Sequence, residues 1–294
     1  MGNGTIIMNM ELLNFYKKTS AYTELGNYKD FAYSLPNDIK TLCLLQRRQI
    51  IHPITVIEAL NGKNDFHVSN TRLVFEDDIF PTAGSMLNEL LRLDKNYSVK
   101  RKDEDRIYIT CRGQAILLAA ILKAKGYSAR VRSGFAPYIK YDGVAHDHWI
   151  TEYFNDKEKR WILVDPDMCL DEIKFNPFDM PRCEFVFGAQ AYLGLRTKHY
   201  KDEEILFATN PPTFGFKAAI RGLFYDFYSL MNEEGIFLHL PKYIVDKNFE
   251  LSEEEFRELD TLATLLLDVD KNFGEIQNIW NNVLKYRIRK GALN

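Results

Sequence analysis

The sequence predicts a mixed α+β protein in which one apolar helix packs on an antiparallel sheet. Residues 115–125 are almost all apolar and good helix formers, and Gly126 supplies a stop after them. Residues 147–154 and 161–165 are rich in β-branched and aromatic side chains, and a short charged turn separates them, which is typical of a β-hairpin. Beyond residue 171 apolar residues recur at helical spacing. We therefore expect a core of one helix and a hairpin, with additional helices at both ends.

The composition and net charge indicate which classes of partner to expect. The chain has 294 residues, of which 46% are hydrophobic, and this is ample for a buried interior. Its 38 Lys and Arg residues against 41 Asp and Glu residues give a net charge of −3. Because no basic surface is indicated, neither a nucleic acid nor a membrane is an expected partner.

The cysteines and the start of the chain favour a reducing compartment. Cys43, Cys111, Cys169 and Cys183 lie far apart, unlike the closely spaced cysteines of small disulfide-stapled domains. The first residues lack a basic leader followed by an apolar core, and no apolar run is long enough to cross a bilayer. We expect a cytoplasmic protein.

The segments before residue 107 are predicted to be helices joined by polar loops. The densely charged residues 94–106 are expected to form a solvated loop. Leu35-Pro36 reads as a helix entry, and Pro53 is expected to end the helix that follows. One helix, followed by a turn near Gly26, is expected within residues 8–34, and further helices are expected at residues 39–51 and 85–93.

The segment after the apolar helix is expected to begin the sheet. Residues 127–134 alternate between apolar or small and polar side chains, which favours a strand. Residues 137–143 then form a long loop that is expected to overhang the site, where Tyr138 and Tyr141 are candidates to touch a substrate.

The C-terminal part is predicted to be mainly helical. Ser252 and Glu255 have the spacing of a capping box. Residues 268–274 resemble a calcium loop, but Phe273 stands where the sharp turn needs glycine and Ile279 where a bidentate glutamate belongs, so a plain loop is expected. Helices are expected at residues 185–195, 216–231, 252–267 and 276–288.

Cys111 is the candidate nucleophile. The run Ile109-Thr110-Cys111 is extended and turns into the apolar helix, so the cysteine lies in the first helical turn. Unpaired backbone N–H groups and the helix dipole both favour thiolate over thiol at that position. The alternative is a buried structural cysteine, which is the more common state of intracellular cysteines.

His148 and Asp165 are the candidate base and orienting carboxylate. The hairpin would place Asp165, at the end of its second strand, beside His148 at the start of its first. His146 shares the strand face of His148, so the two could instead ligate a metal, but the close ligand pairs of zinc sites are missing, and His146 is expected to be solvated at the cleft mouth. Asp167 competes with Asp165 and is expected to be a solvated turn residue.

These pieces together resemble the transglutaminase-like superfamily, a branch of the papain-like thiol enzymes. A cysteine opens an apolar helix, a His-Trp pair follows in a strand, and an Asp-Pro pair closes the next strand. The resemblance implies a papain-like core at residues 107–167. It implies a transglutaminase-like domain over residues 1–175 and a helical C-terminal extension over residues 176–294. The matching segments are residues 110–115, 126–135, 147–153 and 161–166.

The resemblance implies acyl transfer through a Cys111-His148-Asp165 triad, without a cofactor and without a metal. Hydrolysis of an amide or peptide bond is favoured over protein-glutamine transamidation, because nothing in the sequence indicates a tunnel that shields a thioester from water. The substrate would be a peptide, a protein or a small amide. A coenzyme A-dependent N-acetyltransferase and a non-catalytic binding scaffold stay open as alternatives.

The oxyanion of such a reaction needs two donors. The backbone N–H of Cys111 is the first. Relatives often use an upstream side chain as the second, but no tryptophan precedes Cys111, so Gln46 and the phenol of Tyr108 are the candidates.

Overall fold

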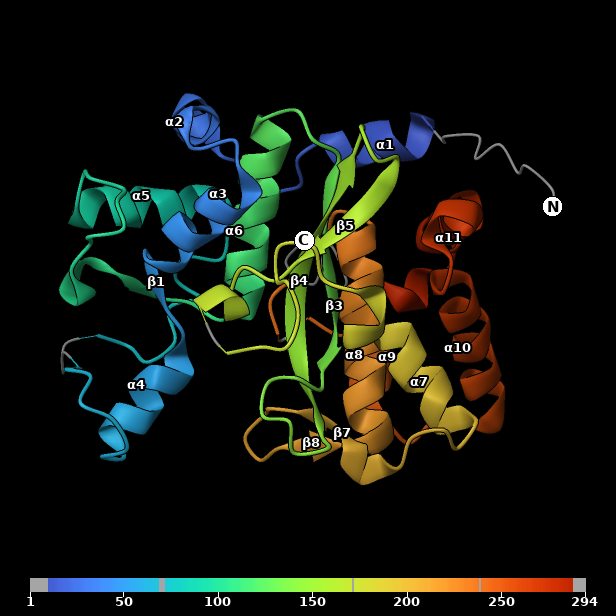
Figure 1. The fold of residues 1–294 in the computed structure, drawn as a ribbon. Helices are drawn as coiled ribbons and strands as arrows, with labels where there is room; N and C mark the ends of the chain where they lie inside the picture. The colour runs from blue at the N-terminus through green and yellow to red at the C-terminus, as the bar shows by residue number, and fades with distance from the viewer. Residues whose placement is uncertain (1–9, 69–71, 171, 238, 288–294) are drawn as a thin grey trace.

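A computed structural model describes residues 10–68, 72–170, 172–237 and 239–287 and confirms a mixed α+β fold (Figure 1). The helices are α1 Met10–Lys17, α2 Lys29–Ser34, α3 Ile39–Arg47, α4 Pro53–Leu60, α5 Ala83–Leu93, α6 Cys111–Ala124, α7 Gly188–Arg196, α8 Gly215–Leu230, α9 Lys242–Asp246, α10 Glu253–Leu266 and α11 Val269–Asn282. The strands are β1 Ile50–Ile51, β2 Ile107–Tyr108, β3 Ala129–Ala136, β4 Ala145–Asn155, β5 Arg160–Val164, β6 Val186–Phe187, β7 Ile205–Phe207 and β8 Thr213–Phe214.

The main sheet is mixed. Its strand order is β6-β3-β4-β7-β8, and β5 pairs with β4 as well. β3 is antiparallel to β4 and β6, and β4 is antiparallel to β5, but β7 runs parallel to β4. The expected antiparallel sheet is therefore right for the centre and wrong at β7. β1 and β2 form a separate parallel pair.

The predicted hairpin forms as β4 and β5. Phe154 lies opposite Trp161, and Thr151 lies opposite Val164. β5 ends at Val164, and Pro166, which has no backbone N–H to donate to a ladder, follows soon after.

Helix α6 lies against β3 and β4 and is buried along almost its whole length. In Figure 1 it stands beside β4, on the same side as α2, α3, α4 and α5, whereas α7, α8 and α10 lie beyond β3. One apolar core joins α6, the sheet and α8, with Leu118, Trp149 and Leu223 among its members. Since β6, β7 and β8 belong to the main sheet, residues beyond 176 help to build this core; the division into two units at residue 176 stays a prediction.

Two expected boundaries near residue 50 are wrong. Helix α3 ends at Arg47, and Ile50 and Ile51 pair with β2 instead of continuing the helix. β-Branched isoleucines suit a strand, so tertiary pairing outweighs the helical spacing here. Pro53 does not end a helix but begins α4, where its missing N–H costs nothing.

Two further segments differ from expectation. Arg101, in the charged run 94–106, is buried and donates hydrogen bonds to the Leu90 and Asp105 carbonyls. Residues 268–274 are not a loop, because Asp268 accepts the Lys271 N–H and caps α11. The predicted Ser252–Glu255 capping box is confirmed. Residues 8, 9 and 288, at the ends of two expected helices, lie outside the described residues.

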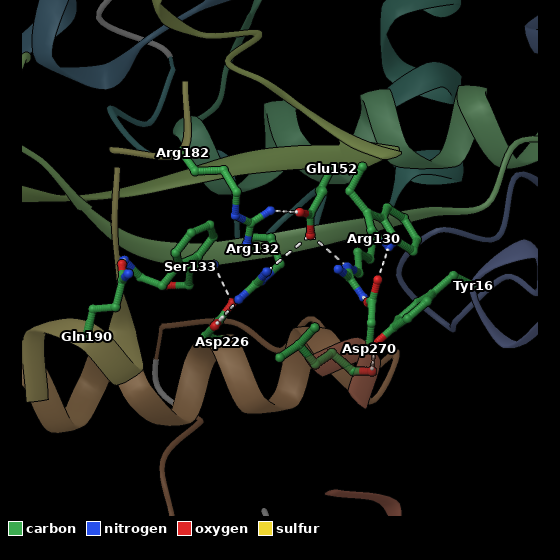
Figure 2. Close-up of polar contacts among 12 residues, drawn as sticks. Tyr16, Arg130, Arg132, Ser133, Glu152, Arg182, Gln190, Asp226 and Asp270 are labelled. Carbon is green, nitrogen blue, oxygen red and sulfur yellow. Dashed lines mark hydrogen bonds and ion pairs between the residues drawn. The ribbon is translucent and has the colours of Figure 1, made fainter. Parts of the chain in front are cut away.

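A buried ion network ties the sheet to the C-terminal helices (Figure 2). Glu152 of β4 accepts from Arg130 at 2.7 Å, from Arg132 at 3.1 Å and from Arg182 at 2.6 Å. Arg132 also forms a bidentate ion pair with Asp226 of α8, in which Nε and Nη2 each donate to a carboxylate oxygen at 2.8 Å. Burial alone would raise the pKa of Glu152, but the three arginine charges hold that pKa far below its usual range.

Glu152→Gln is expected to lower the free energy of unfolding by about 3–5 kcal/mol, since it leaves buried guanidinium charges without their partner. Urea unfolding measures this loss. The carboxylate stabilises the fold above its unfolded pKa, so the loss shrinks as the pH falls below about 4.

Glu158→Gln is the matched control, because Glu158 pairs with Arg160 on the surface at 2.6 Å. Its expected effect is under about 0.5 kcal/mol. Equal effects of the two substitutions would show that the buried network does not stabilise the fold.

In the part of the chain that the structure describes, no helix is both long enough and apolar enough to cross a membrane.

Candidate active site

Cys111 is the first residue of α6, and the contacts of the residue before it fix its position. The preceding residue, Thr110, is extended, with φ −70° and ψ 173°. Its hydroxyl and its N–H both donate to the Asp77 carboxylate, the hydroxyl at 2.6 Å. A Cβ at Gly113 would lie 2.2 Å from Ile109 Cγ2, so glycine lets the first helical turn pack on the end of the strand. The role of Asp77 could not be predicted from the sequence, because Asp77 lies 33 positions upstream of Thr110 in a loop.

His148 and Asp165 meet as predicted. The His148 Nε2 atom lies 2.8 Å from Asp165 Oδ2. Both side chains are buried, with 2% and 0% of their surfaces exposed. Because a carboxylate only accepts, Nε2 carries the proton, which leaves Nδ1 as the ring nitrogen that can exchange a proton with a thiol.

Asp165 is held by further donors. Its Oδ1 accepts the backbone N–H groups of Asp167 and Met168, both at 3.0 Å. Its Oδ2 also accepts the Tyr138 hydroxyl at 2.7 Å. Tyr138 was expected in an overhanging loop, but it is buried and fixes the carboxylate instead of reaching for a substrate.

The three side chains are electrostatically coupled. Burial raises the pKa of the Cys111 thiol, and the charge of His148 and a hydrogen bond with it oppose that rise. Burial alone would lower the pKa of His148, but Asp165 and Cys111 raise it well above the usual value. His148 and the donors around Asp165 hold the pKa of that carboxyl below its usual value against burial. The helix terminus alone therefore does not ionise Cys111; a thiolate depends on a protonated His148.

Asp167 is not the expected solvated turn residue. It is buried, its Oδ1 accepts from Gln114 Nε2 at 2.5 Å, and Arg47 Nε lies 3.5 Å from the same oxygen. His52 Nε2 lies 3.7 Å from its Oδ2. These contacts of Asp167 could not be predicted from the sequence, because Arg47 and His52 come from the distant segment around β1.

Among the described residues, His52, Cys111 and Asp167 form the one group of at least three residues whose potential metal-ligand atoms lie close together, all within 4.8 Å. Chemically the group does not suit a metal. His52 Nδ1 accepts the Ile54 N–H at 3.2 Å, so the proton of a neutral ring is on Nε2, which then has no lone pair to offer. Asp167 is already bonded to Gln114.

The remaining predicted residues lie as follows. His146 is buried rather than solvated, and its Nε2 is 3.4 Å from Asp142 Oδ2. Gln46 Nε2 donates to the Gln114 carbonyl at 2.8 Å. Tyr108 belongs to a separate apolar cluster with Ile51 and Val56.

The Tyr138 hydroxyl gives a stability prediction. Tyr138→Phe is expected to lower the free energy of unfolding by about 1.5–3 kcal/mol, because a buried hydrogen bond to a charged group is lost. Tyr33→Phe, on α2 and 65% exposed, should change it by less than about 0.5 kcal/mol. Urea titrations of both variants make the comparison. No difference between them would mean that Tyr138 does not hold Asp165.

Comparisons with known proteins add little to this geometry. No protein-family model matches the chain, and no curated protein matches it. A solved structure from Cytophaga hutchinsonii, provisionally described as a cysteine protease, is similar with a TM-score of 0.35 and 13% identity. The match covers 62% of this chain and 47% of that one, so it spans about half of that protein. A likeness of this extent carries no functional argument.

Proposed function

We propose that the protein is a cysteine-dependent hydrolase of the transglutaminase-like type, which cleaves an amide or peptide bond through Cys111, His148 and Asp165. The observation that carries the proposal is the 2.8 Å contact between His148 and Asp165, with His148 also coupled to a cysteine at the start of α6. A structural cysteine has no need of a buried imidazole fixed by a carboxylate.

In the first half of the reaction the Cys111 sulfur attacks the carbonyl carbon. The S–C bond forms as the carbonyl π pair moves to oxygen, and the thiol proton is held on His148 Nδ1. When the tetrahedral intermediate collapses, the C–N bond breaks and His148 gives that proton to the leaving amine. A thioester remains on Cys111.

In the second half water attacks the thioester while His148 takes its proton. The S–C bond breaks, His148 returns the proton to the sulfur, and a carboxylic acid leaves while the Cys111 thiol is regenerated. Asp165 keeps the His148 proton on Nε2 in both halves, so that Nδ1 faces the reacting atoms. The Cys111 N–H, one of the unpaired donors of the first turn of α6, stabilises the oxyanion.

The test uses p-nitrophenyl acetate as a simple acyl donor. We expect a burst of one p-nitrophenolate per protein and an acetyl group on Cys111, found by intact mass and peptide mapping. The acyl-enzyme should then release acetate at a rate that an added primary amine does not change. Formation of the N-acetyl amine would favour transamidation, and a protein that is never acylated on Cys111 would refute the proposal and favour a binding scaffold.

A further inference from the structure

His52 is brought to the start of α6 by the small parallel pair of strands. Ile51 of β1 lies opposite Tyr108 of β2, and the Ile109 N–H donates to the Ile51 carbonyl at 3.1 Å. The next residue on the β1 side is His52, and the segment opposite it leads into Cys111. A ring nitrogen of His52 lies within 4.8 Å of the Cys111 sulfur.

The protonation of the His52 ring is set by α4. His52 is the N-cap of this helix, and its Nδ1 accepts the Ile54 N–H. The neutral ring therefore carries its proton on Nε2, the atom on the side of Asp167. At 3.7 Å the Asp167 Oδ2 atom is beyond hydrogen-bond distance, so the His52 Nε2–H does not donate a hydrogen bond to it.

The surroundings favour a neutral His52 ring whose side chain is not fully buried. Burial lowers the pKa of His52, and the charges of Arg47 and His148 add to this against the opposing effect of Asp167. Arg47 and Gln114 already engage Asp167, which reduces the repulsion that its charge would exert on an oxyanion. The side chain of His52 remains 20% exposed.

We propose that the His52 Nε2–H is the second donor to the oxyanion that forms when Cys111 attacks a carbonyl. The inference rests on the proposed function. The oxyanion and the sulfur are bonded to the same carbon, so a donor at hydrogen-bond distance from the oxyanion lies about 4–5 Å from the sulfur. A ring nitrogen of His52 lies within 4.8 Å of the Cys111 sulfur, which fits this requirement. Gln46, in contrast, is bonded to the Gln114 carbonyl, and Tyr108 lies in a separate cluster.

Two substitutions separate the oxyanion contact from the helix cap. In His52→Asn the amide oxygen replaces Nδ1 as the cap acceptor, but nothing reaches the place of Nε2. In His52→Gln the amide nitrogen replaces Nε2 as a donor, and the cap is lost. A structural role predicts that the asparagine variant is the better one, and an oxyanion role predicts the reverse.

Two probes are applied to each variant. In acylation by p-nitrophenyl acetate the S–C bond forms through an oxyanion, p-nitrophenolate leaves, and the thiol proton goes to His148. Alkylation by iodoacetamide displaces iodide without any oxyanion. We expect His52→Asn to slow acylation about 10²-fold while alkylation is unchanged, and His52→Gln to recover most of the acylation rate.

If His52→Asn is acylated at the wild-type rate, the inference is wrong. It is also wrong if the rates of acylation and alkylation fall together, because that result indicates an effect on the thiol itself. If the wild-type protein is alkylated on Cys111 but never acylated, the proposed function fails and the inference falls with it. Acylated wild-type protein with unaffected His52 variants overturns the inference alone.

Discussion

Cys111→Ala is expected to abolish the burst of acylation by p-nitrophenyl acetate, with a fall in rate on the order of 10⁵ or more, because the sulfur beside His148 that forms the thioester is removed. The measurement is the p-nitrophenolate burst, together with the intact mass of the product. The fold should persist, since a small residue replaces a small one at the start of a well-packed helix.

Cys43→Ala is the matched control. Cys43 is likewise buried in the main core, and burial raises the pKa of its thiol well above the usual value, to which Cys169, Asp165 and Asp38 add. We expect its burst to equal that of the wild type, with a loss of about 1 kcal/mol in stability. A burst that survives in Cys111→Ala would show that the nucleophile is a different residue.

Asp165→Asn is expected to reduce the acylation rate about 10³–10⁴-fold. Two backbone N–H groups fix the side-chain oxygen that replaces Oδ1, so the new amide nitrogen must face His148 Nε2. That nitrogen donates, so Nε2 must accept and the His148 proton moves to Nδ1. The ring can then no longer take a proton from the thiol.

The pH dependence gives this substitution a second readout. The pKa of His148 is raised in the folded protein, so the protonated ring persists above about pH 6.5 and is lost only as the pH rises through the raised value. Without the Asp165 charge that pKa falls, and the alkaline limb of the rate profile should move toward lower pH.

Asp167→Asn is the control for the competing carboxylate. Asp167 contacts Gln114 and Arg47, whereas Asp165 bonds to the imidazole of His148 directly. We expect an effect of about tenfold or less and no shift of the alkaline limb. A larger effect for Asp167→Asn than for Asp165→Asn would reverse their roles.

The centre of the site could be predicted from sequence because its signals are local. An apolar helix with a cysteine at its start and a hairpin that ends in Asp-Pro each show in a single stretch of chain, and the hairpin register brings Asp165 to His148. Their catalytic roles remain a prediction.

The support around the centre could not be predicted in the same way. Asp77 holds Thr110 from a loop, and His52 arrives through a strand pair of only two residues on each side. Such short strands have no pattern of their own, and Pro53 looked like the end of one helix when it begins another. The charges at Glu152 were hidden for a related reason, because alternation in a strand does not reveal that both faces are covered.

The most direct test of the account is the rate at which iodoacetamide alkylates Cys111 near neutral pH in the wild type and in His148→Gln. Burial alone raises the pKa of the thiol, and His148 is the group that opposes it. We expect alkylation to slow at least about tenfold in the variant, because fewer molecules carry a thiolate. Equal rates in the two proteins would contradict it.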